Sequence, residues 1–129
     1  MSDIVLDASA LLALLKDEPG GDKVAQGLSA SCISAVNYAE VVSYFIHAGM
    51  PASAVDAMLS PLPITIVAAN ADLATLAGRL RATTAEAGLS LGDRFCIALA
   101  VREGLPAWTA DRQWRAISGQ VGAEIVLIR

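Results

Sequence analysis

Short aliphatic runs alternate with longer helical patterns along this chain, and the two patterns predict different elements. Short apolar runs bounded by turn residues are typical of buried strands. They predict strands at residues 4–6, 32–34, 64–67, 107–109 and 124–128. Apolar positions recurring at three and four residues predict helices. These helices are expected at residues 8–15, 22–28, 35–47, 52–59, 71–86, 91–102 and 111–117.

The alternation of strands and helices indicates an α/β protein. Strands that read as continuous apolar runs are typical of a parallel sheet with helices on both faces. We therefore expect a three-layer α/β/α fold around a central, mainly parallel sheet of about five short strands. No repeat, low-complexity tract or long linker interrupts the pattern, so residues 1–129 are expected to form a single domain.

The composition is unusually apolar but does not predict a membrane protein. Hydrophobic residues make up 55% of the chain and the mean hydropathy is +0.55. The longest apolar runs are nevertheless interrupted well before the roughly 20 residues that a membrane-spanning helix needs. Residues 1–7 are too short and too acidic a stretch for a signal peptide. We expect a soluble, cytoplasmic protein that makes no membrane contact.

The charge and the cysteines argue against further classes of protein. The net charge of −4 argues against a nonspecific basic nucleic-acid binder. Cys32 and Cys96 lie in apolar stretches without metal-ligand spacing, so we expect buried thiols and no disulfide. The single histidine, His47, ends a predicted helix and is expected at the surface.

Three aspartates stand at helix starts, where two roles are open to each. Asp7 and Asp111 directly follow predicted strands, and either could be a helix N-cap. Asp93 follows Ser90 by three residues, which is the spacing of a capping box. In a parallel sheet, however, ligands bind beyond the carboxyl ends of the strands. Asp7 and Asp111 are therefore also candidates for a binding site at that edge.

Glu40 is harder to explain as a structural residue. It is the only formally charged residue between Lys23 and Asp56, and its helix is apolar nearly all round, as a buried helix would be. No Lys or Arg lies three or four residues away, and a buried carboxylate is costly without a cation. A solvated helix face or a distant ion pair stays open, but metal ligation is the favoured interpretation.

Clustered carboxylates point to a divalent metal. Carboxylate oxygens are hard ligands that suit Mg²⁺, with Mn²⁺ a plausible substitute. Such ions can activate a water and stabilise the leaving oxygen in a displacement at phosphorus. The sequence carries no phosphate-binding glycine loop and no Ser–His–acid or Cys–His pattern. The expected metal ligands and catalytic residues are Asp7, Glu40, Asp93 and Asp111.

Four short motifs together resemble the PIN-domain ribonucleases. They are Asp-Ala-Ser-Ala at residues 7–10, Asn-Tyr-Ala-Glu at 37–40, Leu-Gly-Asp at 91–93 and Thr-Ala-Asp at 109–111. The chain length and the leucine-rich helix that ends at Glu18-Pro19-Gly20 are similar to those of VapC toxins from toxin–antitoxin pairs. The resemblance spans essentially the whole chain.

The resemblance implies a metal-dependent endoribonuclease that acts as the toxin of such a pair. It makes Asp7, Glu40 and Asp93 the main metal ligands, with Asp111 completing the site. It gives supporting roles to three polar residues, Ser9, Asn37 and Thr109. Three arginines, Arg94, Arg112 and Arg115, follow site acids closely and could bind RNA phosphates. Ordinary caps, local ion pairs or solvated charges are the alternatives for these residues.

The resemblance also implies partners. They are a cognate antitoxin protein that covers the site, the RNA substrate and a second copy in a homodimer. The apolar helices at residues 38–46 and 50–59 offer surface for such contacts, although core packing accounts for the same side chains.

Two other functions remain open. In a phosphatase, Asp7 would be a covalent nucleophile, but the second aspartate expected two residues later is Ser9 here. The last lysine is Lys23, so the late lysine of such enzymes is also missing. In an inactive PIN-like binding module the acids would have degenerated, yet all four positions are filled.

Overall fold

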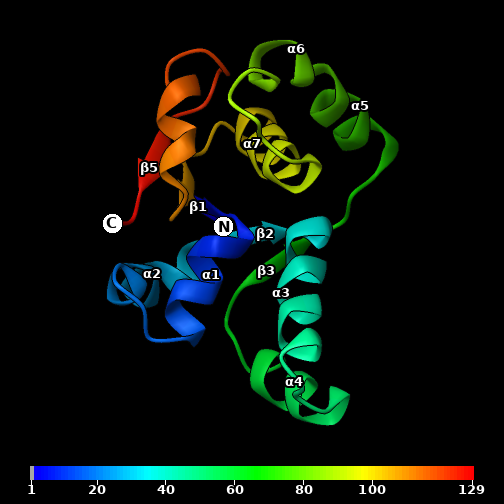
Figure 1. Cartoon of the computed structure of the whole chain (residues 1–129), viewed down its shortest axis with the longest axis vertical. Coiled ribbons are helices and arrows are strands. Elements are labelled where there is room, and N and C mark those ends of the chain that lie inside the picture. Colours follow the sequence, from blue (N-terminus) through cyan, green and yellow to red (C-terminus); the bar gives the residue numbers. More distant parts are fainter. Residues whose placement is uncertain (1) are drawn as a thin grey trace.

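A parallel sheet of five strands forms the centre of the computed structural model, which describes residues 2–129 (Figure 1). The spatial order is β3-β2-β1-β4-β5, and every neighbouring pair is parallel. The first strand of the chain therefore lies in the middle of the sheet. The strands are β1 (Ile4–Leu6), β2 (Ser31–Ser34), β3 (Thr65–Val67), β4 (Ala107–Thr109) and β5 (Ile125–Leu127).

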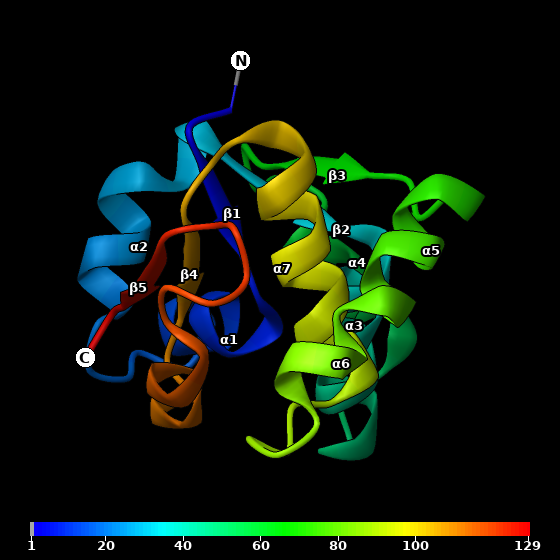
Figure 2. The same cartoon turned by 90° about the horizontal axis from the view of Figure 1, so that it is seen from above.

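Helices cover both faces of this sheet, as Figures 1 and 2 show. One face carries α1 (Ala8–Leu15), α2 (Gly21–Gly27), α3 (Ala35–His47) and α4 (Ala52–Leu59), with the short 3₁₀ helix η1 (Leu28–Ala30). The other face carries α5 (Ala71–Arg79), α6 (Arg81–Thr84), α7 (Leu91–Glu103) and the 3₁₀ helix η2 (Arg112–Ile117). The predicted three-layer α/β/α fold is confirmed.

The adjacent strands β1 and β2 have apolar side chains on both faces of the sheet. Successive side chains of a strand point to opposite faces. Val5 and Cys32 accordingly enter the core beneath α7, while Leu6 and Ile33 enter the core beneath α1 and α3. All four side chains are buried, because each face of the sheet is covered. The predicted burial of Cys32 and Cys96 as free thiols is confirmed.

The helix expected over residues 71–86 is wrong in its length, since the chain forms α5 and α6 with a break at Leu80. The hydroxyls of Thr83 and Thr84 both donate to the Leu80 carbonyl, at 3.1 and 2.9 Å. Such local bonds compete with the helical ladder and bend helices. The helix predicted at residues 111–117 is a 3₁₀ helix, η2, with Asp111 as its N-cap.

The expectation that α3 is a buried helix is also wrong. Only Asn37, Val41 and Phe45 of this helix are buried. Tyr44 and Ile46 are 39% and 44% exposed, so its apolar composition reflects an apolar surface as well as a core face. His47 is exposed, as predicted. Among residues 2–129, no helix combines the length and apolar character that crossing a membrane requires.

Candidate active site

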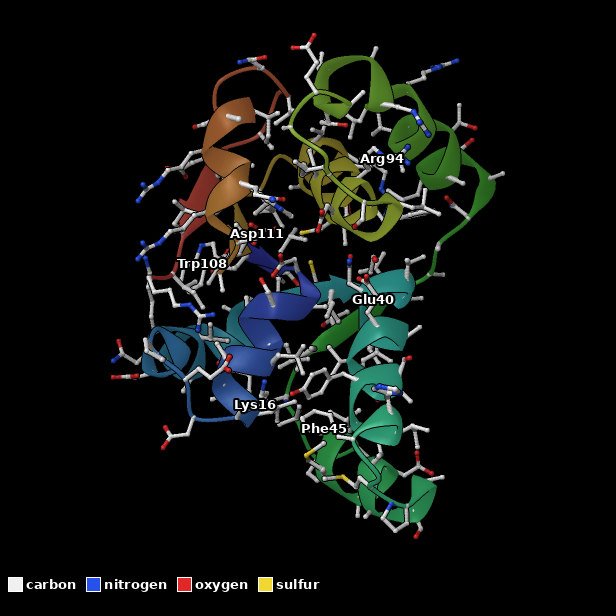
Figure 3. All side chains as sticks on the ribbon, in the orientation of Figure 1. Lys16, Glu40, Phe45, Arg94, Trp108 and Asp111 are labelled. Carbon is white, nitrogen blue, oxygen red and sulfur yellow. The ribbon has the colours of Figure 1, made fainter. Side chains whose placement is uncertain are left out.

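The four acids come from four separate segments and gather beyond the carboxyl ends of the central strands. Asp7 follows β1 and Asp111 follows β4, which are neighbours in the sheet. Glu40 lies in the second turn of α3, the helix that follows β2, and Asp93 lies in the first turn of α7. Figure 3 shows Asp111 and Glu40 on either side of α1. This is the edge where the sheet topology predicts ligand binding.

Asp7 is the buried member of this group, with 3% of its surface exposed. It caps α1, because its Oδ1 accepts the Ala10 N–H at 2.8 Å. Burial raises the pKa of Asp7 to about 7, although hydrogen bonds from Thr109, Ala10 and Ser9 act to lower it. The negative charge of Asp93 raises it further. Asp7 therefore lies in a place where a cation would be stabilising.

Two hydroxyls tie Asp7 to the segment that follows β4. The Thr109 hydroxyl donates to Asp7 Oδ2 at 2.6 Å and accepts the Asp111 N–H at 3.0 Å. The Ser9 hydroxyl donates to the same carboxylate at 2.8 Å and accepts the Ala110 N–H at 2.9 Å. Each hydroxyl is thus both donor and acceptor, which fixes the orientation of the carboxylate. Ser9 and Thr109, which were expected to support the site, thus both donate hydrogen bonds to Asp7.

Glu40 is held by Asn37, one turn earlier on α3. Asn37 Nδ2 donates to Glu40 Oε1 at 2.9 Å and to the Gly92 carbonyl of α7 at 2.8 Å. Asn37 is itself fixed by the Ser34 hydroxyl, which donates to its Oδ1 at 2.7 Å. Partial burial raises the pKa of Glu40, the Asn37 bond lowers it, and the charge of Asp93 raises it again. Glu40 is more exposed than its sequence context predicts.

Asp93 combines a capping role with a place in the acid group. Its Oδ2 accepts the Ser90 N–H at 2.9 Å and the Ser90 hydroxyl accepts the Asp93 N–H at 3.2 Å, which completes the predicted capping box. Partial burial raises the pKa of Asp93, the Ser90 bonds lower it, and the charge of Asp111 raises it. The buried Trp114 indole N–H, which forms no hydrogen bond of full geometry, also lowers the pKa of Asp93.

Asp111 is the acid at the carboxyl end of β4. It is partly exposed, and its Oδ1 accepts the Gln113 N–H at 2.9 Å as the N-cap of η2. The following arginines, Arg112 and Arg115, are exposed on this short helix. The predicted caps at Asp7, Asp93 and Asp111 are therefore all present, and each coexists with a place near the other acids.

Arg94 directly follows Asp93 in the sequence, but its side chain does not point toward the acids. Its Nη1 donates to the Ala77 carbonyl of α5 at 3.1 Å, and the side chain is buried between α7 and α5. Figure 3 shows it well apart from Glu40 and Asp111. The sequence spacing placed Arg94 on the right helix but gave no information about the helix face.

The acids could hold a divalent cation, but they are not drawn together around one. Within residues 2–129 no three His, Cys, Asp or Glu side chains are already close enough to hold a metal ion jointly. None of the four acids forms an ion pair with a basic residue in this part of the chain. Mg²⁺ commonly keeps several waters and binds through one or two carboxylates. The mutual repulsion and the hard oxygen donors fit such an ion.

The comparisons with known proteins agree with this geometry. The family model described as PIN domain matches residues 4–120. The chain belongs to the PIN domain family. No curated protein matches this PIN domain in sequence.

Solved structures similar to this PIN domain include toxin–antitoxin proteins. A toxin–antitoxin complex from Klebsiella pneumoniae matches with a TM-score of 0.74 at 19% identity, over 98% of both chains. A DNA-bound VapBC from Salmonella typhimurium matches with a TM-score of 0.75 at 18% identity, over 100% of both chains. VapC20 of Mycobacterium tuberculosis, a sarcin–ricin loop cleaving toxin, matches with a TM-score of 0.72 at 19% identity, over 95% of this chain and 99% of that one. At these identities the likeness concerns the fold.

Gly92 is a site residue of this PIN domain that the sequence interpretation missed. A Cβ atom placed on Gly92 would lie 2.6 Å from Glu40 Cδ, so only glycine leaves room for the carboxylate there. The available signal was a glycine in the first turn of a helix, directly before a site acid, where glycine is otherwise unfavourable.

Proposed function

We propose that this PIN domain is a metal-dependent endoribonuclease that hydrolyses RNA phosphodiester bonds. One observation carries the proposal: four carboxylates from distant parts of the chain gather at the ligand-binding edge of the sheet, and none of them forms an ion pair with a basic residue within residues 2–129. The charges of Asp93 and Asp111 raise the pKa values of their acidic neighbours. A group kept in such repulsion is costly unless it serves to bind a cation.

Mg²⁺ is the proposed cofactor, with Mn²⁺ as an alternative. Asp7 and Asp93 are the central ligands, because the charge of Asp93 already acts on Asp7 and on Glu40. Glu40 and Asp111 complete the site directly or through water. A bound divalent ion supplies charge stabilisation at the phosphoryl oxygens and a more acidic water. Ser9, Asn37 and Thr109 orient the carboxylates through the hydrogen bonds described above.

RNA is proposed as the substrate by analogy with relatives of the same fold. VapC20, similar in structure, is a toxin that cleaves the sarcin–ricin loop. Two exposed arginines of this chain, Arg112 and Arg115, follow Asp111 on η2 and could bind backbone phosphates beside the acids. Neither forms an ion pair within residues 2–129, so both are available to a ligand.

The proposed biological role is that of a toxin controlled by a cognate antitoxin protein. Similar structures are VapBC and other toxin–antitoxin complexes. The exposed apolar side chains of α3, Tyr44 and Ile46, offer a surface for an antitoxin or for a second copy in a homodimer. Action in the cytoplasm belongs to the same proposal.

Asp7→Asn and Asp93→Asn test the proposal, because asparagine keeps the capping geometry and removes the charge. Purified wild-type protein in Mg²⁺ should cut a structured RNA, and each variant should lose at least about a hundredfold of that rate. Asp72→Asn, an exposed acid of α5, is the matched control and should cut normally. Full activity of either site variant, or of wild type in excess EDTA, would refute the proposal.

A further inference from the structure

Arg94 is a buried cation without an anion. Only 8% of its surface is exposed, and it forms no ion pair within residues 2–129. Its Nη1 has the Ala77 carbonyl as a partner, but its buried Nε–H has no hydrogen-bond partner. Burying a guanidinium is costly unless an anion or a full set of acceptors meets it. Binding of an anionic ligand at the Arg94 guanidinium would therefore be stabilising.

An open pocket of about 350 Å³ lies beside this guanidinium. Arg94 and Arg81 both line it, together with Gly88, Ser90 and the apolar side chains next to them. Arg81 is exposed and also lacks an ion-pair partner among the described residues. No acidic side chain is among the residues that line the pocket. The pocket therefore has two positively charged residues in its lining, of which Arg94 is buried and Arg81 is exposed.

We propose that this pocket binds a backbone phosphate of the RNA strand, next to the phosphate that is cleaved. Guanidinium groups match the geometry of phosphate oxygens and can bind them with paired hydrogen bonds. The inference rests on the proposed ribonuclease function, which it extends from the reaction to the path of the substrate.

Ser90 is the reason to choose a nucleic-acid strand over another anion. Ser90 lines the pocket, and its backbone N–H donates to Asp93 Oδ2 at 2.9 Å. The pocket and the acid group therefore share one capping box. An RNA strand with one phosphate at Asp93 would therefore pass the Ser90 side of the pocket with its neighbouring phosphates. A carboxylate of a protein partner would need no such proximity to Asp93.

The buried Nε–H of Arg94 is a direct probe of occupancy. We would record its NMR resonance in metal-free protein with EDTA, so that binding is seen without cleavage. Titration with inorganic phosphate and then with a short single-stranded RNA should shift this resonance. Absence of a shift with both ligands would overturn the proposal. A shift with a glutamate-rich peptide and none with RNA would also overturn it, in favour of a protein ligand.

Arg81→Gln tests the same pocket without disturbing the core, because Arg81 is exposed. RNA affinity in EDTA should fall about fivefold, as expected for one lost charged hydrogen bond. The slope of log affinity against log salt should decrease by about 1. Arg102→Gln is the control, since it removes the same charge from the far end of α7. Equal behaviour of the two variants would overturn the proposal.

The measurements in EDTA separate this inference from the proposed function. If wild type cuts no RNA but the Arg94 resonance responds to RNA, the ribonuclease proposal fails and the pocket stands. If wild type cuts RNA while Arg94 and Arg81 are indifferent to it, the pocket fails and the ribonuclease proposal stands.

Discussion

The Glu40 carboxylate of α3 lies against Gly92 of α7, in the space where any other residue at position 92 would place its Cβ atom. The buried Asn37 amide reinforces this contact, because it donates to both Glu40 and the Gly92 carbonyl. The α3 and α7 helices, which are distant in the sequence, are thereby joined at the acid group. Asp93, the next residue of α7, takes its position from the same contact.

Gly92→Ala should therefore impair activity more than stability. The added methyl group displaces the flexible Glu40 side chain, so we expect a stability change within about 1 kcal/mol. Misplacement of a catalytic group by about 1 Å can cost up to about a hundredfold in rate. RNA cleavage and chemical denaturation would measure the two effects. Gly78→Ala in α5 is the control, since a Cβ there meets no atom within 4 Å. Unchanged cleavage by Gly92→Ala would show that the Glu40 position is unimportant.

Thr109→Val should destabilise the protein and disorder Asp7. The substitution removes the buried donor to Asp7 and leaves the partly buried Asp111 N–H without its acceptor. Unsatisfied buried groups of this kind cost about 1–3 kcal/mol, which urea denaturation can resolve. Thr109→Ser keeps the hydroxyl and should retain most of the cleavage activity. Equal stability of the valine and serine variants would contradict the role of this hydroxyl.

Metal-free protein should lose stability as the pH rises from about 4 to about 7. Burial raises the pKa of Asp7 from 3.8 to about 7, so in this window the folded state binds a proton that the unfolded chain has released. The folded state is then favoured at the lower pH. The contribution of Asp7 to this effect is at most about 4 kcal/mol, taking 1.36 kcal/mol for each pKa unit. Denaturation curves in EDTA would measure it.

Two variants separate this effect from general acid sensitivity. Asp7→Asn should flatten the pH dependence, because asparagine does not titrate. Asp72→Asn, at an exposed position, should keep it. A wild-type stability that rises steadily between pH 4 and pH 7 would contradict the assignment.

Divalent metal should reverse this dependence. A metal ion binds the deprotonated carboxylates, so it competes with protons at the acid group. Addition of Mn²⁺ or Mg²⁺ should raise the Tm more at pH 8 than at pH 5, with proton release visible by calorimetry. Asp93→Asn should weaken both signals. An equal Tm in metal and in EDTA at pH 8 would argue against a resident ion.

Much of the fold could be predicted because the strands are short and parallel, and because β1 and β2 near the middle of the sheet are almost entirely buried. Asp7 and Asp111 could be placed at one edge because each directly follows a strand, and parallel strands end on the same side. Both residues are also helix N-caps, and this role is compatible with a place at the edge of the sheet. An N-cap at the carboxyl end of a strand points its side chain toward the edge where ligands bind.

The features that were not predicted depend on which face of each helix packs against the core. The sequence pattern does not carry this information. The α3 helix reads as buried because Tyr44 and Ile46 are apolar, yet both are exposed. Arg94 reads as a companion of Asp93, yet one helical step directs it toward α5. The sequence marks Gly92 only as an unusual glycine in the first turn of a helix; its contact with Glu40 could not be inferred, because the two residues lie on different helices.

The bond between Thr109 and Asp7 joins residues that are 102 positions apart. During translation Asp7 is therefore made well before its partner Thr109, which is synthesised 102 residues later. The β1 strand, which carries Asp7, also has no neighbour on its β4 side until then. Under the ribonuclease function proposed above, this order means that the nascent chain carries no finished catalytic centre until Thr109 has been added and has reached Asp7.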